Sequence, residues 1–188
     1  MPRYLQEFGE YCEITGFRGV EINDPKTFLA AMASEELVDV AVQFFDADLV
    51  ATWEHLYFAL FDALTAFKNG DNISRSLAME TVLYASAKKQ IRRATESIGV
   101  KAGLSNVAVL VIGEKVESVK SAIVGISSII GGELDESVLE LSKQKLEKIK
   151  SAFKISEAEI KSVMGRGNVE GAVVDLVIER VALLASAC

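Results

Sequence analysis

VAVLVI, residues 107–112, is an unbroken apolar run in which β-branched valine and isoleucine predominate. A short run of this composition predicts a buried β-strand. YCEITGF at 11–17 and VDVAVQFF at 38–45 carry the same signal, and a shorter strand is expected at Val138–Leu141. These four segments predict one sheet whose strand order the sequence leaves open.

The segments between the strands predict helices, because their apolar residues recur at three- and four-residue spacing. The expected helices span residues 26–33, 53–68, 76–98, 114–130, 143–153, 156–164 and 169–185. The segment 76–98 either continues as one helix or breaks and restarts near Ser86. The pattern predicts an α/β (α+β) fold: a single mixed β-sheet of about four strands, packed by several helices, with a long C-terminal helix.

Capping residues support the starts of four helices. Asp24 is followed by a proline, which suits the first turn of a helix because its missing N–H would be unpaired there anyway. Thr52 and Ser76 are expected at N-cap positions. Ser156 stands three residues before Glu159, and this pair predicts a capping box.

The length of 188 residues suits a single domain over 1–188, with residues 1–10 as a candidate flexible N-terminal extension. No apolar run approaches the roughly 20 residues that cross a bilayer, and the first residues have no signal-peptide core. Cys12 and Cys188 form neither a disulfide framework nor a metal motif. We therefore expect a cytoplasmic protein. The mean hydropathy of +0.27 predicts that a partner covers some apolar surface.

Most catalytic signatures are missing from the sequence. It has one histidine, His55, which we expect to pack inside the protein, and it has no serine-hydrolase elbow or phosphate-binding loop. Gly165, Gly167 and Gly171 do not have the spacing of a dinucleotide fingerprint. The sequence therefore predicts no enzyme activity, no cofactor and no metal site.

Residues 73–99, ISRSLAMETVLYASAKKQIRRATESIG, hold a cluster of four cations in a chain of formal net charge -7. On a continuous helix, one face would be cationic and the opposite face apolar, with Tyr84, Ile91 and Ile98 among its apolar residues. Only Glu96 offers a neighbouring acid. A solvated helix face is one interpretation. The alternative is a site for the phosphates of a few single-stranded nucleotides, since the cluster is too small to recognise duplex DNA.

Five segments in order resemble one family. They are WEHLYFALFDALTAF, which contains His55, followed by NISRSLAMETVLYASAKKQI, AVLVIG, GGELDESVLEL and GRGNVEGAVVDLVIERVALL. Together they resemble the small kinase-binding subunit of the KEOPS (EKC) complex, a member of the CGI family known in animals as the PRPK-binding protein. The resemblance extends over residues 11–185.

The resemblance implies a noncatalytic regulatory subunit. KEOPS-type complexes make threonylcarbamoyladenosine (t6A) in tRNA, and the small subunit binds and stimulates a kinase-like ATPase directly. The catalytic threonylcarbamoyl-transfer subunit is an indirect partner in the same complex. The resemblance also implies tRNA recruitment through the single-stranded 3′ CCA end. The acidic pI of about 4.9 and the lack of a long apolar run predict no DNA and no membrane partner. A protein-interaction module without RNA binding is the alternative, and a small-molecule enzyme or sensor is the third possibility.

The resemblance and the basic cluster together nominate two sets of residues. The tRNA-binding set is Arg75, Ser86, Lys88, Lys89, Gln90, Arg92 and Arg93. The partner-binding set, for which core packing is the alternative, is Val173, Val177, Arg180, Val181 and Leu184. The chain departs from the family pattern at Ala87, where glycine is usual, at Lys89, where arginine is common, and at Asp46, where asparagine is usual.

Overall fold

The computed structural model describes residues 1–33, 37, 39–165 and 167–186. The chain forms two compact units. Met1–Ala47 and Val100–Val138 make up the first, which we call the sheet unit. Asp48–Gly99 and Leu139–Cys188 make up the second, the helical unit. Each unit is therefore built from two separate stretches of the chain.

The described part of the sheet unit carries five strands, and β4 lies between β2 and β3. The strands are β1 (Arg3–Leu5), β2 (Glu10–Arg18), β3 (Val40–Asp46), β4 (Asn106–Gly113) and β5 (Glu133–Leu134). Their order is β1-β2-β4-β3, with β5 also paired to β2. Leu110 of β4 lies opposite Ile14 on one side and Gln43 on the other. The predicted α+β class is confirmed, but the described pairings are all antiparallel rather than mixed.

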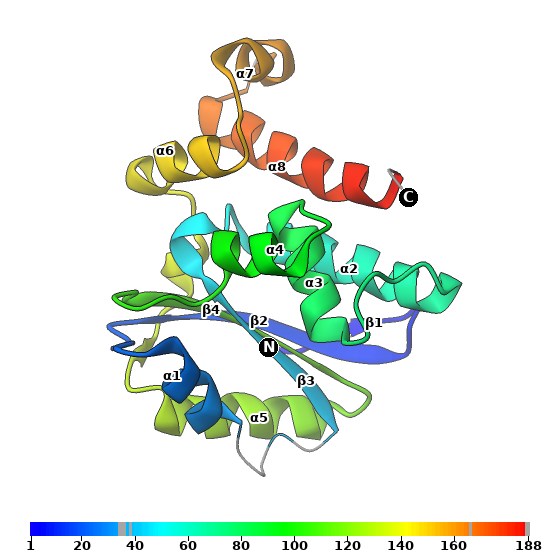
Figure 1. The fold of residues 1–188 in the computed structure, drawn as a ribbon, viewed down its shortest axis with the longest axis vertical. Helices are drawn as coiled ribbons and strands as arrows, with labels where there is room; N and C mark the ends of the chain where they lie inside the picture. The colour runs from blue at the N-terminus through cyan, green and yellow to red at the C-terminus, as the bar shows by residue number, and fades with distance from the viewer. Residues whose placement is uncertain (34–36, 38, 166, 187–188) are drawn as a thin grey trace. The chain divides into compact units, whose positions relative to one another are not determined.

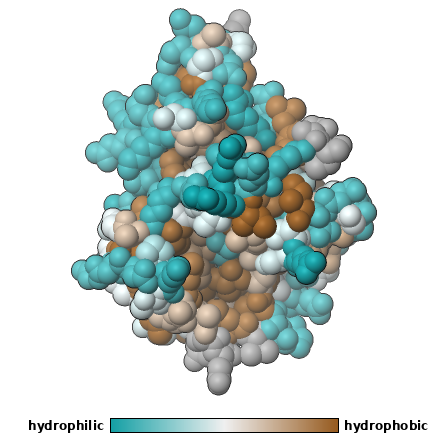
Figure 2. Space-filling view, viewed as in Figure 1, coloured by the Kyte–Doolittle hydropathy of each residue, from teal (hydrophilic) through white to brown (hydrophobic). Residues whose placement is uncertain are grey.

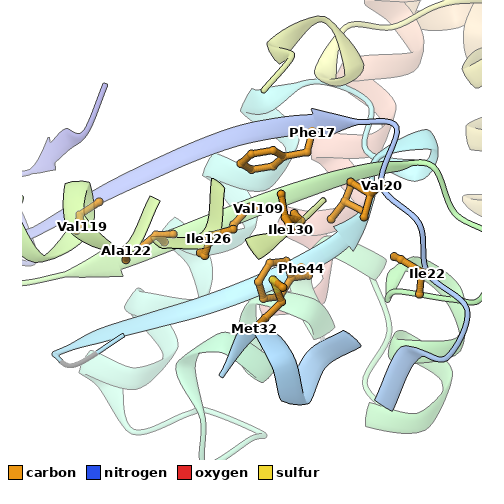
Figure 3. Close-up of a cluster of buried hydrophobic side chains, with 12 residues drawn as sticks. Phe17, Val20, Ile22, Met32, Phe44, Val109, Val119, Ala122, Ile126 and Ile130 are labelled. Atoms are coloured by element: carbon orange, nitrogen blue, oxygen red, sulfur yellow. The ribbon is translucent and has the colours of Figure 1, made fainter. Parts of the chain in front are cut away.

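Two helices cover one face of this sheet, α1 (Pro25–Met32) and α5 (Val116–Ile129). Figure 1 shows α5 running along the face, with α1 beside it. Alternate residues of β4 point to the same face, so Val109 meets Phe17 and Phe44 in one buried cluster. Ile126 of α5 and Met32 of α1 close the cluster from the helical side (Figure 3).

The strand predicted at Val138–Leu141 is wrong. Residues Glu136–Leu139 form a 3-10 turn instead. The carboxylate of Asp135 accepts the N–H of Ser137 at 2.9 Å, and the N–H of Val138 donates to the carbonyl of Asp135 at 3.3 Å. These local hydrogen bonds satisfy backbone N–H groups that would pair with a neighbouring strand if the segment were part of a sheet. The Ser137 and Arg18 side chains also hold the pKa of Asp135 at about 2.

The helical unit contains six α-helices in its described part: α2 (Trp53–Asn69), α3 (Leu77–Ser86), α4 (Ile91–Ile98), α6 (Lys143–Ala152), α7 (Glu157–Met164) and α8 (Val169–Ser186). The long helix α8 packs against α2, α3, α6 and α7. Figure 1 shows α6 and α7 near the N-terminal end of α8. Ile149, Ile160, Val173 and Val177 lie in the buried cluster that joins α6, α7 and α8.

Most of the expected caps are present. Asp24 accepts the N–H of Thr27, Ser76 accepts that of Met79, and Ser156 forms the predicted capping box with Glu159. Thr52 occupies the predicted N-cap position of α2, but its hydroxyl is buried and makes no hydrogen bond. Val38, predicted as the first residue of a strand, lies outside the described residues.

In the described ranges, no helix is both long enough and apolar enough to cross a membrane.

Candidate functional site

The predicted basic helix is broken at Ala87. The N–H of Ala87 donates to the carbonyl of Tyr84 at 2.9 Å, and the N–H of Lys88 donates to the carbonyl of Leu83 at 3.0 Å. This pair of bonds is a Schellman motif, and Ala87 adopts its left-handed conformation with φ 52° and ψ 40°. The structure therefore has the broken form of the segment, in which two of its lysines lie in a turn.

The break changes the predicted faces. A continuous helix would have placed Ile91 in the apolar stripe, but this side chain is 46% exposed. Gln90 is the N-cap of α4, and its side chain makes no cap hydrogen bond. Two cations remain on the short helix α4, Arg92 and Arg93.

A second Schellman motif ends α6. The N–H of Lys154 donates to the carbonyl of Ser151 at 3.3 Å, and the N–H of Ile155 donates to the carbonyl of Lys150 at 2.8 Å. Lys154 has φ 53°, so a lysine occupies the left-handed position that glycine usually fills.

The two turns and the C-terminal half of α8 line an open cavity of about 560 Å³ within the helical unit. It is lined by Ser86, Ala87, Lys88, Lys89, Gln90, Arg93, Ala152, Phe153, Lys154, Arg180, Leu183 and Leu184. The lining combines cations with apolar side chains and includes no carboxylate among the described residues. Figure 2 shows strongly hydrophilic surface over α4 next to a hydrophobic patch. Such a lining suits an anionic ligand that also carries an apolar group.

Two lysines from different turns, Lys88 and Lys154, line this cavity. The ammonium group of Lys88 donates to the hydroxyl of Ser97 at 3.0 Å and to the carbonyl of Ser86 at 3.3 Å, and both acceptors are neutral. Burial, together with the charge of Lys154, lowers the pKa of Lys88. Arg92 differs, because it pairs with Glu96 at 2.8 Å and does not line the cavity.

Arg180 fixes one wall of the cavity. Its Nε–H donates to the carbonyl of Phe153 at 3.0 Å, and its Nη2 group donates to Oε1 of Glu159 at 2.6 Å. The Ser156 cap and Arg180 together hold the pKa of Glu159 at about 2, so this carboxylate is charged at neutral pH. Arg180 thereby ties α8 to the turn that carries Lys154.

His55 lies behind the cavity wall and is fully buried, which confirms its predicted packing role. The N–H of Ala51 donates to Nδ1 at 3.2 Å, so the ring carries its proton on Nε2 and donates it to the carbonyl of Ala85 at 2.8 Å. The ring also meets Phe153 edge-on, with centroids 5.4 Å apart. Burial lowers the pKa of His55 to about 4, and the ring is therefore neutral at neutral pH.

The tRNA-binding set divides in two. The members that line the cavity are Ser86, Lys88, Lys89, Gln90 and Arg93. Arg92 and Arg75 do not line it. Arg75 lies on an exposed loop that Glu80 anchors by accepting the N–H groups of Ser74 and Ile73 at 2.6 and 3.1 Å.

The partner-binding set is mostly buried within the chain. Val173, Val177 and Val181 have no exposed surface, and Leu184 is 7% exposed. The burial of the valines favours core packing, because a side chain without exposed surface cannot contact a partner docked on the folded chain. Arg180 and Leu184 line the cavity instead.

Sequence reasoning missed Ala152, Phe153 and Lys154, all of which line the cavity. Lys154 stands in a lysine-rich helical stretch and gave no sign of a turn, since the glycine that normally marks this turn is absent.

Comparison with known proteins decides the family. Residues 17–185 match the model of the kinase-binding protein family CGI-121. The chain belongs to the CGI-121 family. It is also 34% identical over 173 residues to the regulatory protein Cgi121 of Methanocaldococcus jannaschii, an alignment that covers 91% of this chain and 95% of that protein. The predicted resemblance is thus confirmed, and CGI-121 membership supports a regulatory role without catalysis. Within the described ranges, no group of three or more histidine, cysteine, aspartate or glutamate side chains is placed to hold a metal ion.

Proposed function

We propose that this chain is the noncatalytic regulatory subunit of a KEOPS-type t6A complex. In this role it docks on the kinase-like ATPase subunit, stimulates that subunit, and recruits tRNA through the single-stranded 3′ CCA end. Membership of a kinase-binding family supports the first part. The observation that carries the RNA part is the cavity, where cations from two turns surround apolar side chains without a described carboxylate.

The size of the cavity supports a ligand of a few nucleotides at most. A volume of about 560 Å³ falls within the roughly 300–1,000 Å³ of typical ligand pockets. A duplex is too wide for such a site, whereas a single-stranded end can place a phosphate on the cations and a base against the leucines. The formal net charge of -7 works against nonspecific attraction of nucleic acid elsewhere on the chain.

A tRNA-binding assay with and without the CCA end tests the RNA part. We expect binding that is lost when the end is removed, with a slope of log K against log salt of about -1.4 to -2.8 for two to four neutralised phosphates. Lys89→Glu and Arg93→Glu should abolish binding. Lys161→Glu, an exposed lysine on α7, is the matched control and should not. Unchanged affinity after trimming the CCA end would exclude this mode of recruitment.

A pull-down with the kinase-like subunit tests the docking part. Because the valines of α8 are buried, we propose that docking uses the outward face of this helix, where Asp175 and Glu179 are exposed. The double variant Asp175→Lys/Glu179→Lys should lose the kinase, whereas Glu117→Lys on α5 should retain it. Retention of the kinase by the wild-type chain without any tRNA binding would instead favour the protein-interaction module.

A further inference from the structure

Two strained turns meet at one cavity. In the part of the chain that the structure describes, three residues other than glycine have positive φ: Asp39 (63°), Ala87 (52°) and Lys154 (53°). Two of the three line the cavity of the helical unit. Left-handed backbone is unfavourable for residues with a Cβ, and unfavourable conformations of this kind concentrate at functional sites. The left-handed backbone conformation of Lys154 therefore indicates a functional role for this residue.

Lys88 and Lys154 occupy neighbouring places in two copies of the same motif. Lys88 follows the left-handed residue that ends α3, and Lys154 is the left-handed residue that ends α6. The two turns are distant in sequence, yet both lysines line one cavity, and the charge of Lys154 contributes to lowering the pKa of Lys88. Within the described ranges, Lys154 makes no ion pair with a carboxylate. Two neighbouring cations without an acid between them favour the entry of an anion.

We propose that Lys88 and Lys154 together bind one phosphate group, and that the left-handed turn at Lys154 exists to place its ammonium group at this site. The inference rests on the proposed function for the source of the phosphate, which would be a phosphodiester of the tRNA 3′ end. The phosphate chemistry itself rests only on the two lysines. Each ammonium group can donate a charge-assisted hydrogen bond to a phosphate oxygen.

Lys154→Gly is the sharpest test variant. Glycine adopts φ 53° without strain, so this variant should melt at the same temperature as the wild type or higher, and weaker binding could not be attributed to unfolding. With a short single-stranded RNA ending in CCA as the probe, we expect affinity to fall about tenfold. The salt slope should become less negative by about 0.7, because one phosphate contact is lost. Lys161→Gln is the matched control and should leave both quantities unchanged.

Lys88→Gln tests whether both lysines hold the same phosphate. If both lysines hold the same phosphate, the double variant Lys88→Gln/Lys154→Gly should lose less binding free energy than the sum of the losses in the two single variants. Full additivity of the two losses would overturn the shared site.

Inorganic phosphate separates this inference from the proposed function. In an NMR titration of the full chain, the backbone amides of Lys88 and Lys154 should shift with phosphate and not with chloride at equal ionic strength. Such shifts without any RNA binding would refute the RNA part of the proposed function and leave the phosphate site standing. RNA binding that is equally tight in Lys154→Gly would overturn the phosphate site and leave the proposed function standing. The absence of phosphate-specific shifts would also overturn the site.

Discussion

His55 holds three segments of the helical unit together through one ring. It accepts from Ala51, donates to Ala85 just before the broken turn, and packs against Phe153 of the opposite cavity wall. Protonation of Nδ1 would direct an N–H of the ring at the N–H of Ala51 and leave a charge in a fully buried site. The neutral ring is therefore part of what positions the cavity.

The stability of the protein should depend on His55 as the pH falls. The unfolded chain binds a proton near pH 6.5 and the folded chain only near pH 4, so stability is fully present above 6.5 and is lost as the pH falls toward 4. We expect the free energy of unfolding to drop by about 2 kcal/mol from His55 alone between roughly pH 7.5 and pH 5. Urea unfolding at several pH values measures this drop. His55→Gln should show a correspondingly smaller dependence on pH, and an equal dependence would contradict the assignment.

Ala87→Gly should stabilise the protein. Glycine has no Cβ and so removes the steric strain of the folded state at φ 52°. This gain in free energy is larger than the cost of the extra conformational entropy that glycine gives the unfolded chain. We expect a gain of about 0.5–1 kcal/mol in the free energy of unfolding, measured with urea. Ala182→Gly, at an exposed position inside α8, is the matched control and should cost about 1 kcal/mol. The family pattern has glycine where this chain has Ala87, and the left-handed turn explains that preference.

The start of α3 depends on a buried carboxylate. Glu80 has no exposed surface and accepts hydrogen bonds from the backbone of Ser74 and Ile73, which precede the helix. These bonds fix the loop that carries Arg75. The start of α3 is thus fixed by a side chain from its own first turn.

Glu80→Ala should release this loop. We expect a loss of roughly 2–4 kcal/mol in the free energy of unfolding, because the buried N–H of Ser74 loses its acceptor. Hydrogen exchange should show faster exchange at the amides of Ile73 and Ser74. Glu80→Gln keeps one acceptor oxygen and should lose less. Glu96→Gln, whose exposed pair with Arg92 is worth about 0.5 kcal/mol or less, is the control. Undiminished protection of both amides in Glu80→Ala would refute this role.

The sequence predicted most elements correctly where local chemistry determines them. Asp24 and Ser156 mark helix starts that the structure confirms, because a cap acts within one turn. The strand predicted at Val138–Leu141 was wrong because Asp135 accepts the backbone N–H groups of Ser137 and Val138 through its carboxylate and its carbonyl. β1 and β5 were missed because strands of three and two residues carry too little pattern to be recognised.

The candidate site was only partly predictable for a related reason. Lys88, Lys89 and Arg93 are adjacent in sequence, and their clustering was visible without a structure. Lys154 joins them through folding alone, and its turn has no glycine to mark it. Proximity across 66 residues of chain, from Lys88 to Lys154, depends on how α6 and α8 pack, which periodicity does not reveal.

The connectivity of the whole molecule makes the sheet unit depend on both of its chain stretches, Met1–Ala47 and Val100–Val138. β2 and β3 both pair with β4, yet β2 and β3 precede the first stretch of the helical unit and β4 follows it. A chain cut after Gly99 therefore leaves β2 and β3 without the strand that lies between them. Whether residues 1–188 behave as the single domain expected from their length remains a prediction, which one cooperative unfolding transition would support.

The fragment 1–99 should not fold by itself. Without β4 it lacks the central ladder of the sheet, and an unpaired strand cannot satisfy its backbone groups. Circular dichroism during heating should show no cooperative transition for this fragment, in contrast to the full chain. A cooperative transition in the isolated fragment would show that β2 and β3 find another arrangement.

The late arrival of β4 also matters during translation. The ribosome adds about 5–20 residues per second, so β3 is made several seconds before the end of β4, 67 residues later, leaves the peptidyl-transferase centre. Throughout this interval Phe17 and Phe44, which are core residues in the finished protein, have no central strand to pack on. The nascent chain is thus exposed to aggregation in a defined window, and chaperone capture should be strongest between these two points of synthesis.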